Sequence, residues 1–262
     1  MSDRLRPVPP GVVVRGSAAE LGRVFPALVP LQPIEYSDEG LVCAPRANPD
    51  LDPRDLDVVP LPVEHLDHVP AWPMRPARSA GRWYLRTPAH ALPPTPEIPT
   101  IVVADGDAFG ADQHETTALA LDAIDRLPPG PAVDVGCGAG FLGVAWAASG
   151  KGPVTAVDID RAAIDQTARC ATLNGLASSI TPIQAEIGRL DGSLLEGASL
   201  LANLPPPGHA ALLSHSVLPR AVALGGVSRA DARRIVATWT ARGLRPLHAA
   251  RRGRYEAWIL VR

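Results

Sequence analysis

The sequence predicts an α/β fold, in which a mostly parallel sheet follows a small proline-rich module. Three observations predict it. From residue 101 onward, short apolar runs alternate with amphipathic stretches, which is the pattern of βαβ units. A glycine-rich turn joins one such run to the next amphipathic stretch at 136–140. Before residue 101 the prolines are too dense for long helices, because proline removes a backbone donor and fixes φ.

These differences divide the 262 residues into three parts: a small N-terminal α+β module at 1–70, an extended linker at 71–106 and the main domain at 107–262. The first module is a candidate for recognising a substrate. Within it, alternating segments predict strands at 11–15 and 34–43, and one helix is expected at 20–28.

The main domain is expected to alternate strands with helices. Two helices carry clear terminal signals: Asn174-Gly175 suits a left-handed C-cap, and Ser228 with Asp231 forms the start of a capping box. Helices are predicted at 116–127, 141–149, 161–173 and 228–242. Strands are predicted at 131–135, 154–157, 180–186, 199–202 and 221–225, with a closing hairpin of 244–250 and 255–261.

Composition fits a cytoplasmic globular enzyme. The net charge of -2 disfavours nucleic acid and acidic membranes as general partners. No run approaches the roughly 18 apolar residues of a membrane span. The three cysteines, Cys43, Cys137 and Cys170, form neither a C-x-x-C motif nor a zinc spacing, and no metal-ligand cluster is seen. We therefore expect a reduced setting and no metal; the oligomeric state is not indicated.

The most informative motif is the run from Val133 to Gly143, VDVGCGAGFLG. It predicts a strand, a turn and a helix, with backbone N–H groups of the turn open to a ligand. Dinucleotide-binding proteins use G-x-G-x-x-G, but here the third glycine position is Phe141 and the pattern is G-x-G-x-G. With Asp134 before the turn and Asp158 after the next strand, the motif resembles the S-adenosylmethionine (SAM) site of Rossmann-like methyltransferases.

A second motif precedes the first. The run from Asp107 to Thr117, DAFGADQHETT, resembles the "AFGTGxHxTT" segment of the PrmA-type ribosomal protein methyltransferases, which modify amino groups of a large-subunit ribosomal protein. Matching segments continue at 72–75, 157–160 and 202–204, so that the resemblance covers about residues 70–262. Two departures stand out: Ala111 and Asp112 replace the family's Thr-Gly, and the first 70 residues do not resemble its substrate-binding domain.

The resemblance implies that Thr117, Gly136, Asp158 and Asn203 contact SAM. A carboxylate at Asp158 can accept both ribose hydroxyls, and the amide of Asn203 can donate and accept at the carboxyl edge of the sheet. Structural alternatives stay open for each polar residue: Thr117 can pad its helix, Asp158 can be a solvated strand end, and Asn203 can end a strand before prolines.

Five further residues are candidate cofactor contacts. Gly138 and Gly140 complete the turn. Asp134 either braces the turn or meets the cofactor ammonium group. Glu186 can accept from the adenine amino group, and Phe109 can cover the sulfonium or belong to the core.

The run from Asn203 to Pro207, NLPPP, loosely resembles the N-P-P-Y motifs that hold an acceptor nitrogen, which makes Asn203 the candidate catalytic residue. The aromatic residue of those motifs is missing here, and the proline run can equally be a rigid turn.

The predicted function is therefore that of a SAM-dependent N-methyltransferase acting on lysine or N-terminal amino groups of a protein, with a large-subunit ribosomal protein as candidate acceptor. Alternatives are a small-molecule or peptide natural-product methyltransferase, an RNA methyltransferase and a non-catalytic SAM-binding protein. The sequence leaves open the acceptor, the number of methyl groups added and the effect of Ala111 and Asp112.

Overall fold

The chain contains two compact units, Met1–Pro73 and Met74–Arg262. The computed structural model describes residues 11–15, 33–37, 40–43, 63–66, 78–80, 82–86, 97–104, 106, 108–109 and 115–262. The helix predicted at 20–28 lies outside these residues, and so do Ala111 and Asp112. The predicted three-part division stays a prediction.

In its described part, the first unit contains a four-stranded antiparallel sheet. Its strands are β1 (Gly11–Val14), β2 (Pro33–Ser37), β3 (Gly40–Cys43) and β4 (Val63–Leu66), in the order β2-β3-β1-β4. Each neighbouring pair is antiparallel. The strand predicted at 11–15 is confirmed, and the segment 34–43 forms the hairpin of β2 and β3.

The second unit is built on a seven-stranded sheet with the order β10-β9-β8-β11-β12-β14-β13. Five strands are parallel and the last two are antiparallel, which confirms the predicted fold class. The strands are β8 (Ala132–Val135), β9 (Val154–Asp158), β10 (Ile180–Gln184), β11 (Ser199–Asn203), β12 (Ala221–Ser228), β13 (Arg245–Arg252) and β14 (Tyr255–Val261).

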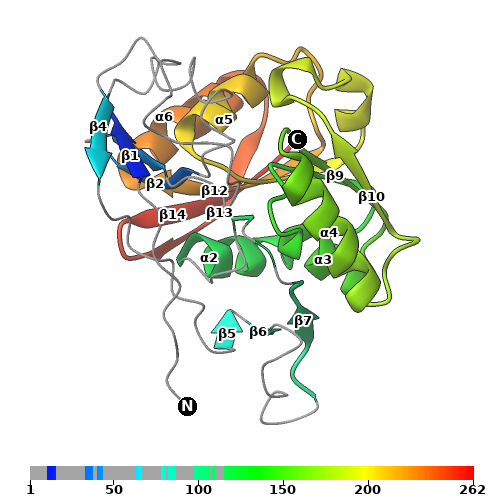
Figure 1. Cartoon of the computed structure of the whole chain (residues 1–262). Helices are drawn as coiled ribbons and strands as arrows, with labels where there is room; N and C mark the ends of the chain where they lie inside the picture. The colour runs from blue at the N-terminus through cyan, green and yellow to red at the C-terminus, as the bar shows by residue number, and fades with distance from the viewer. Residues whose placement is uncertain are drawn as a thin grey trace, which may run out of the picture. The chain divides into compact units, whose positions relative to one another are not determined.

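Helices cover both faces of this sheet, α2, α3 and α4 on one side and α5 and α6 on the other (Figure 1). Each face buries its own apolar cluster, centred on Trp146 of α3 and Trp239 of α6 respectively. The helices are α2 (Glu115–Ile124), α3 (Phe141–Ala148), α4 (Arg161–Leu173), α5 (Pro206–Leu213) and α6 (Arg229–Ala241).

The predicted helix signals are confirmed at both marked ends. The Ser228 side chain accepts a hydrogen bond from the N–H of Asp231 at the start of α6. Gly175, just after α4, has φ of +71°, as a left-handed helix end requires. Strand β12 runs three residues beyond its predicted end, through a bulge at Gly226 (φ +80°).

Helix α5 is a difference from the sequence prediction, which considered only a rigid turn after Asn203. Pro206 and Pro207 occupy the first turn of the helix. Proline is compatible with that position, because the first N–H groups of a helix have no partner within it.

The predicted linker also contains regular structure. Strands β5 (Arg78–Ala80), β6 (Trp83–Arg86) and β7 (Thr100–Val102) form a three-stranded sheet. Trp83, Leu85 and Ile101 are buried in the same apolar cluster as the residues of α2 and α3. Part of segment 71–106 is therefore packed against the main domain, because its apolar side chains need a partner surface.

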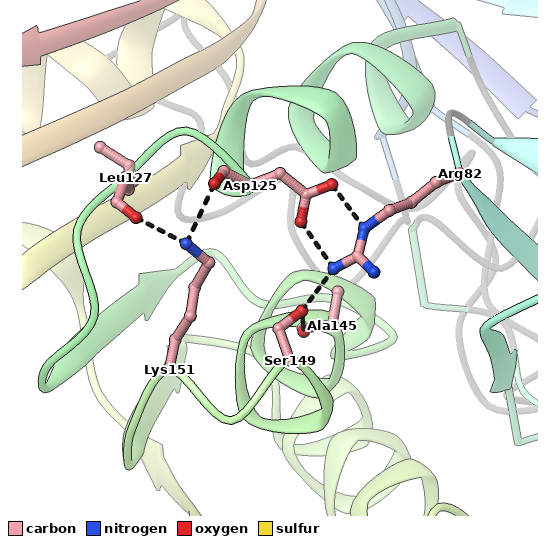
Figure 2. A network of polar contacts seen from close by, with 6 residues as sticks. All are labelled: Arg82, Asp125, Leu127, Ala145, Ser149 and Lys151. Carbon is pink, nitrogen blue, oxygen red and sulfur yellow. Dashed lines mark hydrogen bonds and ion pairs between the residues drawn. The ribbon is translucent and has the colours of Figure 1, made fainter.

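A polar network holds the ends of α2 and α3 together at the amino-terminal edge of the parallel strands (Figure 2). Arg82 donates to both carboxylate oxygens of Asp125, at 2.7 and 2.8 Å, and to the hydroxyl of Ser149 at 2.8 Å. Lys151, the sole lysine, donates to the carbonyls of Asp125 (3.1 Å) and Leu127 (2.5 Å). The two hydrogen bonds from Lys151 satisfy carbonyls at the end of α2 that have no partner within the helix.

Within the described residues, none of the helices has the length and apolar character that crossing a membrane requires.

Candidate functional site

The candidate site lies at the carboxyl ends of β8, β9 and β11. After β8 the chain passes through α3 to β9 on one side, whereas after β11 it passes through α5 to β12 on the other. Ligands of open α/β sheets bind where the connections diverge in this way. The fold places Asp158 and Asn203 as the last residues of β9 and β11, and the glycine turn directly after β8.

The glycine turn is held by hydrogen bonds within the protein. The N–H groups of Gly136 and Cys137 both donate to the carbonyl of Val157, at 2.8 and 3.0 Å. The three following N–H groups donate to the side chain of Asp158, the carbonyl of Phe109 and the carbonyl of Cys137. The expectation that a ligand would bind open N–H groups at 136–140 is therefore wrong in this structure, because each of the five already has a partner.

Close approach by other segments explains the spacing of the glycines. All three have positive φ, +67° at Gly136, +54° at Gly138 and +81° at Gly140. A β-carbon at Gly138 would lie 2.4 Å from the carbonyl oxygen of Phe109, and one at Gly136 would lie 2.2 Å from the side chain of Leu204. The G-x-G-x-G pattern thus lets neighbouring segments pack directly against the turn.

Asp158 links the turn to β9. One carboxylate oxygen accepts from the N–H of Gly138 at 3.0 Å, and the other accepts from the N–H of Asp160 at 3.0 Å. The carboxylate is oriented by the backbone at the sheet edge, and its role toward a cofactor stays a prediction.

Asp134 braces helix α3. Its buried carboxylate accepts a hydrogen bond from the N–H of Gly143 at 2.9 Å, in the first turn of α3. Burial raises the pKa of Asp134 to about 7, the Gly143 hydrogen bond lowers it, and the nearby charge of Asp158 raises it. The contact is to helix α3 and not to the glycine turn that the sequence indicated, and a contact with a cofactor ammonium group stays a prediction.

Thr117 and Asn203 contribute buried polar atoms that lack a hydrogen-bond partner. The Oγ1 atom of Thr117 and the Oδ1 atom of Asn203 are both in this state within the described residues. The Nδ2 atom of Asn203 donates to Oγ1 of Thr116 at 3.3 Å, which directs the side chain toward α2. An unpartnered buried polar atom costs about 1–3 kcal/mol, so these atoms are suited to a ligand that supplies the missing hydrogen bonds.

Phe109 and Glu186 are the two remaining candidate contacts with a cofactor. Phe109 is 41% exposed, and its carbonyl accepts the N–H of Ala139 at 2.9 Å. It therefore borders the glycine turn and is not part of the buried core. Glu186 follows β10, and its carboxylate pairs with Arg189 at 3.0 Å. The expected contacts of Phe109 with the sulfonium and of Glu186 with the adenine stay predictions.

Sequence reasoning missed two polar residues of α4 that contact the site. Thr167 donates to the carbonyl of Gly138 at 3.0 Å, and Gln166 contacts the chain before Phe109. Polar residues inside an amphipathic helix are usually solvated, so the sequence carried no signal that these two are buried.

His209 is fully buried on α5. Its Nε2 atom lies 2.8 Å from the carbonyl of Gly225. Burial lowers the pKa of His209 to about 4, against the raising effect of backbone carbonyls, so the ring is neutral near pH 7. Within the described residues, no group of three or more metal-ligating side chains is present.

Comparison with known proteins adds to this geometry. Residues 71–194 match the family model described as ribosomal protein L11 methyltransferase (PrmA). A ribosomal protein L11 methyltransferase of Syntrophotalea carbinolica is 31% identical over 180 residues, covering 64% of this chain and 56% of that protein. One from Shewanella woodyi is 37% identical over 135 residues, covering 46% of each. The chain thus spans about half the length of these curated relatives.

The fold is also found among solved structures. The ribosomal protein L11 methylase of Lactobacillus delbrueckii subsp. bulgaricus superposes with a TM-score of 0.62 at 22% identity, over 72% of this chain and 99% of that one. At that identity the match supports the fold. Together, the family model and this fold confirm the resemblance seen in the motifs: over residues 71–194 the chain is similar to the PrmA-type family of ribosomal protein methyltransferases.

Proposed function

We propose that this protein is a SAM-dependent N-methyltransferase that modifies amino groups of a protein. One observation carries the proposal: Asp158 and Asn203 end two strands on either side of the glycine turn, and Asn203 and Thr117 each hold a buried, unpartnered polar atom there. The match of residues 71–194 to the family model supports the same reaction.

The residues present fit SAM. Asp158, whose carboxylate the backbone orients at the sheet edge, would accept hydrogen bonds from the ribose hydroxyls. Thr117 and Asn203 would hydrogen-bond the methionine end through their unpartnered oxygens. The glycine turn would offer surface without protruding side chains, and Glu186 would reach the adenine if it leaves Arg189. When bound, SAM supplies an electrophilic methyl group.

The protein's contribution to the reaction is mainly alignment of donor and acceptor. Holding two reactants in line can contribute roughly 7–11 kcal/mol in favourable cases. Asn203 Oδ1 has two lone pairs, so beside its hydrogen bond to the methionine end it would accept a second one and orient an N–H of the acceptor amine. An exposed lysine has a pKa near 10.4, so about three pH units of protonation must be overcome near pH 7. Burial of the amine in the site would lower that pKa.

For the acceptor, we propose a protein of the large ribosomal subunit. Support comes from the curated relatives, which are named as ribosomal protein L11 methyltransferases. The test is incubation of the protein with methyl-labelled SAM and separated large-subunit ribosomal proteins. We expect label in one ribosomal protein band, and none when Asn203→Ala replaces the natural protein.

The second candidate is a small-molecule or peptide methyltransferase. It is favoured by the family match beginning only at residue 71, which leaves the candidate recognition module at 1–70 unmatched. In the same labelling experiment, SAM turnover with a peptide or small-molecule mixture but no labelled ribosomal band would favour it. Label in RNA would instead support an RNA methyltransferase, and SAM binding without any turnover a non-catalytic protein.

A further inference from the structure

Helix α4 and its C-cap hold the end of β7 and the chain that follows it through three side chains spaced four residues apart, Gln166, Cys170 and Asn174. Asn174 accepts the N–H of Val102 at 2.9 Å and donates to the carbonyl of the same residue at 2.7 Å. The thiol of Cys170 accepts the N–H of Ala104 at 3.1 Å. Because residues four apart lie on one face of a helix, the three side chains form a row, the α4 ladder.

Gln166 is the member of the α4 ladder nearest the candidate site. Its side chain is 1% exposed; Oε1 accepts the N–H of Ala108 at 3.0 Å, and Nε2 donates to the carbonyl of Ala104 at 2.8 Å. Gln166 therefore binds the chain at two points on either side of Gly106. A β-carbon at Gly106 would lie 2.4 Å from Oε1, so the backbone passes directly over the amide.

The chain held by Gln166 continues into the site. Phe109, the residue after Ala108, accepts the N–H of Ala139 in the glycine turn through its carbonyl at 2.9 Å. Thr167, the neighbour of Gln166 on α4, donates to the carbonyl of Gly138 at 3.0 Å. Two consecutive residues of α4 thus fix both segments that meet at the glycine turn.

We propose that Gln166 is a positioning residue for the cofactor site. Its two hydrogen bonds hold the backbone of Phe109 against the glycine turn, so that this segment forms one wall of the site. The inference rests on the proposed function, because the wall borders the place where SAM is proposed to bind. Asn174, the C-cap of α4, lies eight residues further along, about 12 Å away at 1.5 Å per residue. Its side chain contacts Val102 and the carbonyl of Cys170, away from Phe109.

The two ends of the α4 ladder give a matched pair of variants. Gln166→Met keeps nearly the same volume and removes both hydrogen bonds at the site end. Asn174→Leu keeps the branched shape and removes the two bonds to Val102 and the one to the carbonyl of Cys170 at the far end. Both variants should lose thermal stability, because each leaves buried backbone groups unpaired. Only Gln166→Met should weaken SAM binding in calorimetry, by about tenfold.

Steady-state kinetics separates positioning from a general loss of structure. Gln166→Met should raise the KM for SAM about tenfold and leave kcat within about twofold, because a displaced wall weakens ground state and transition state alike. Gly106→Ala, which crowds the Gln166 amide without changing it, should give the same pattern. Hydrogen exchange of 104–109 should be faster in both variants and unchanged in Asn174→Leu.

The outcomes distinguish this inference from the proposed function. If the natural protein binds SAM and both Gln166→Met and Gly106→Ala bind it equally well, or if Asn174→Leu weakens binding as much, the positioning role is overturned and the proposed function stands. If the natural protein binds neither SAM nor its demethylated product, both fall. Should Gln166→Met fail to fold, Gly106→Ala decides the question by the same measurements.

Discussion

The carboxylate of Asp158 accepts a hydrogen bond from the N–H of Gly138 at 3.0 Å, across the 20 positions that separate the two residues. This contact ties the end of β9 to the glycine turn after β8. It also orients the carboxylate at the sheet edge where ligands of such folds bind. The residue proposed to hold the ribose therefore also supports the turn that would lie beneath the cofactor.

Asp158→Asn should weaken SAM binding by about tenfold or more, because an amide replaces one accepting oxygen by a donor and one of its partners is then left unpaired. Calorimetry with SAM measures the loss. Asp165→Asn is the matched control, since Asp165 is half exposed and pairs with Arg161 on α4 away from the turn. Equal affinity of the two variants would contradict the role of Asp158.

Asp134 should make stability depend on pH. Because burial raises its folded-state pKa from 3.8 to about 7, the folded protein binds a proton more tightly than the unfolded chain. Its stabilising contribution is complete below about pH 4 and falls as the pH rises to about 7, by at most about 4 kcal/mol.

Asp134→Asn, which is neutral at every pH and can still accept from Gly143, should lack this decline. Urea unfolding at pH 5 and pH 8 checks it: the stability of the natural protein relative to Asp134→Asn should fall between the two. Parallel pH profiles would show that the Asp134 pKa is not raised.

Gly138→Ala should destabilise the protein and impair SAM binding. Its φ of +54° strains any other residue, and the added methyl would meet the Phe109 carbonyl at 2.4 Å. Gly150→Ala is the control, with φ of +67° and no atom within 4 Å. The control should cost about 1–2 kcal/mol for the backbone alone, and Gly138→Ala should cost more. Equal losses in urea unfolding would mean that the Phe109 segment moves aside freely.

Lys151→Met should reduce stability without changing SAM affinity. Lys151 donates to two carbonyls at the end of α2 (Figure 2). They lie at the amino-terminal edge of the parallel strands, whereas the candidate site lies at the carboxyl ends. Hydrogen bonds from a charged donor contribute about 1.5–3 kcal/mol, and the partial exposure of this group places the loss near the lower value. A SAM affinity changed more than about threefold would show that the two edges are coupled.

Local chemistry made much of this fold predictable. Ser228 with Asp231, and Gly175 after α4, signal helix ends through hydrogen bonds and backbone angles that depend only on neighbouring residues. Helix α5 was not predicted because Pro206 and Pro207 are typical of turns. An isolated turn and the first turn of a helix differ only in the backbone hydrogen bonds that follow. Likewise, the bulge at Gly226 depends on pairing with β14, which is 30 residues away in sequence.

At the site, the sequence identified which residues end the strands but not what they contact. The motif indicated Asp158 and the three glycines, yet the occupied N–H groups of the turn depend on Val157, Phe109 and other distant partners. Gln166 carried no signal because its burial depends on a segment about 60 residues earlier in the chain. Contacts of this kind follow from tertiary packing and not from local pattern.

Calorimetry with SAM, its demethylated product and NAD is the most direct test of the central claim. The absence of a third glycine at Phe141 and the polar ends of β9 and β11 predict that SAM and its product bind at one site per chain, and that NAD does not compete with them. Binding of NAD without binding of SAM or its product would contradict the methyltransferase assignment of this site.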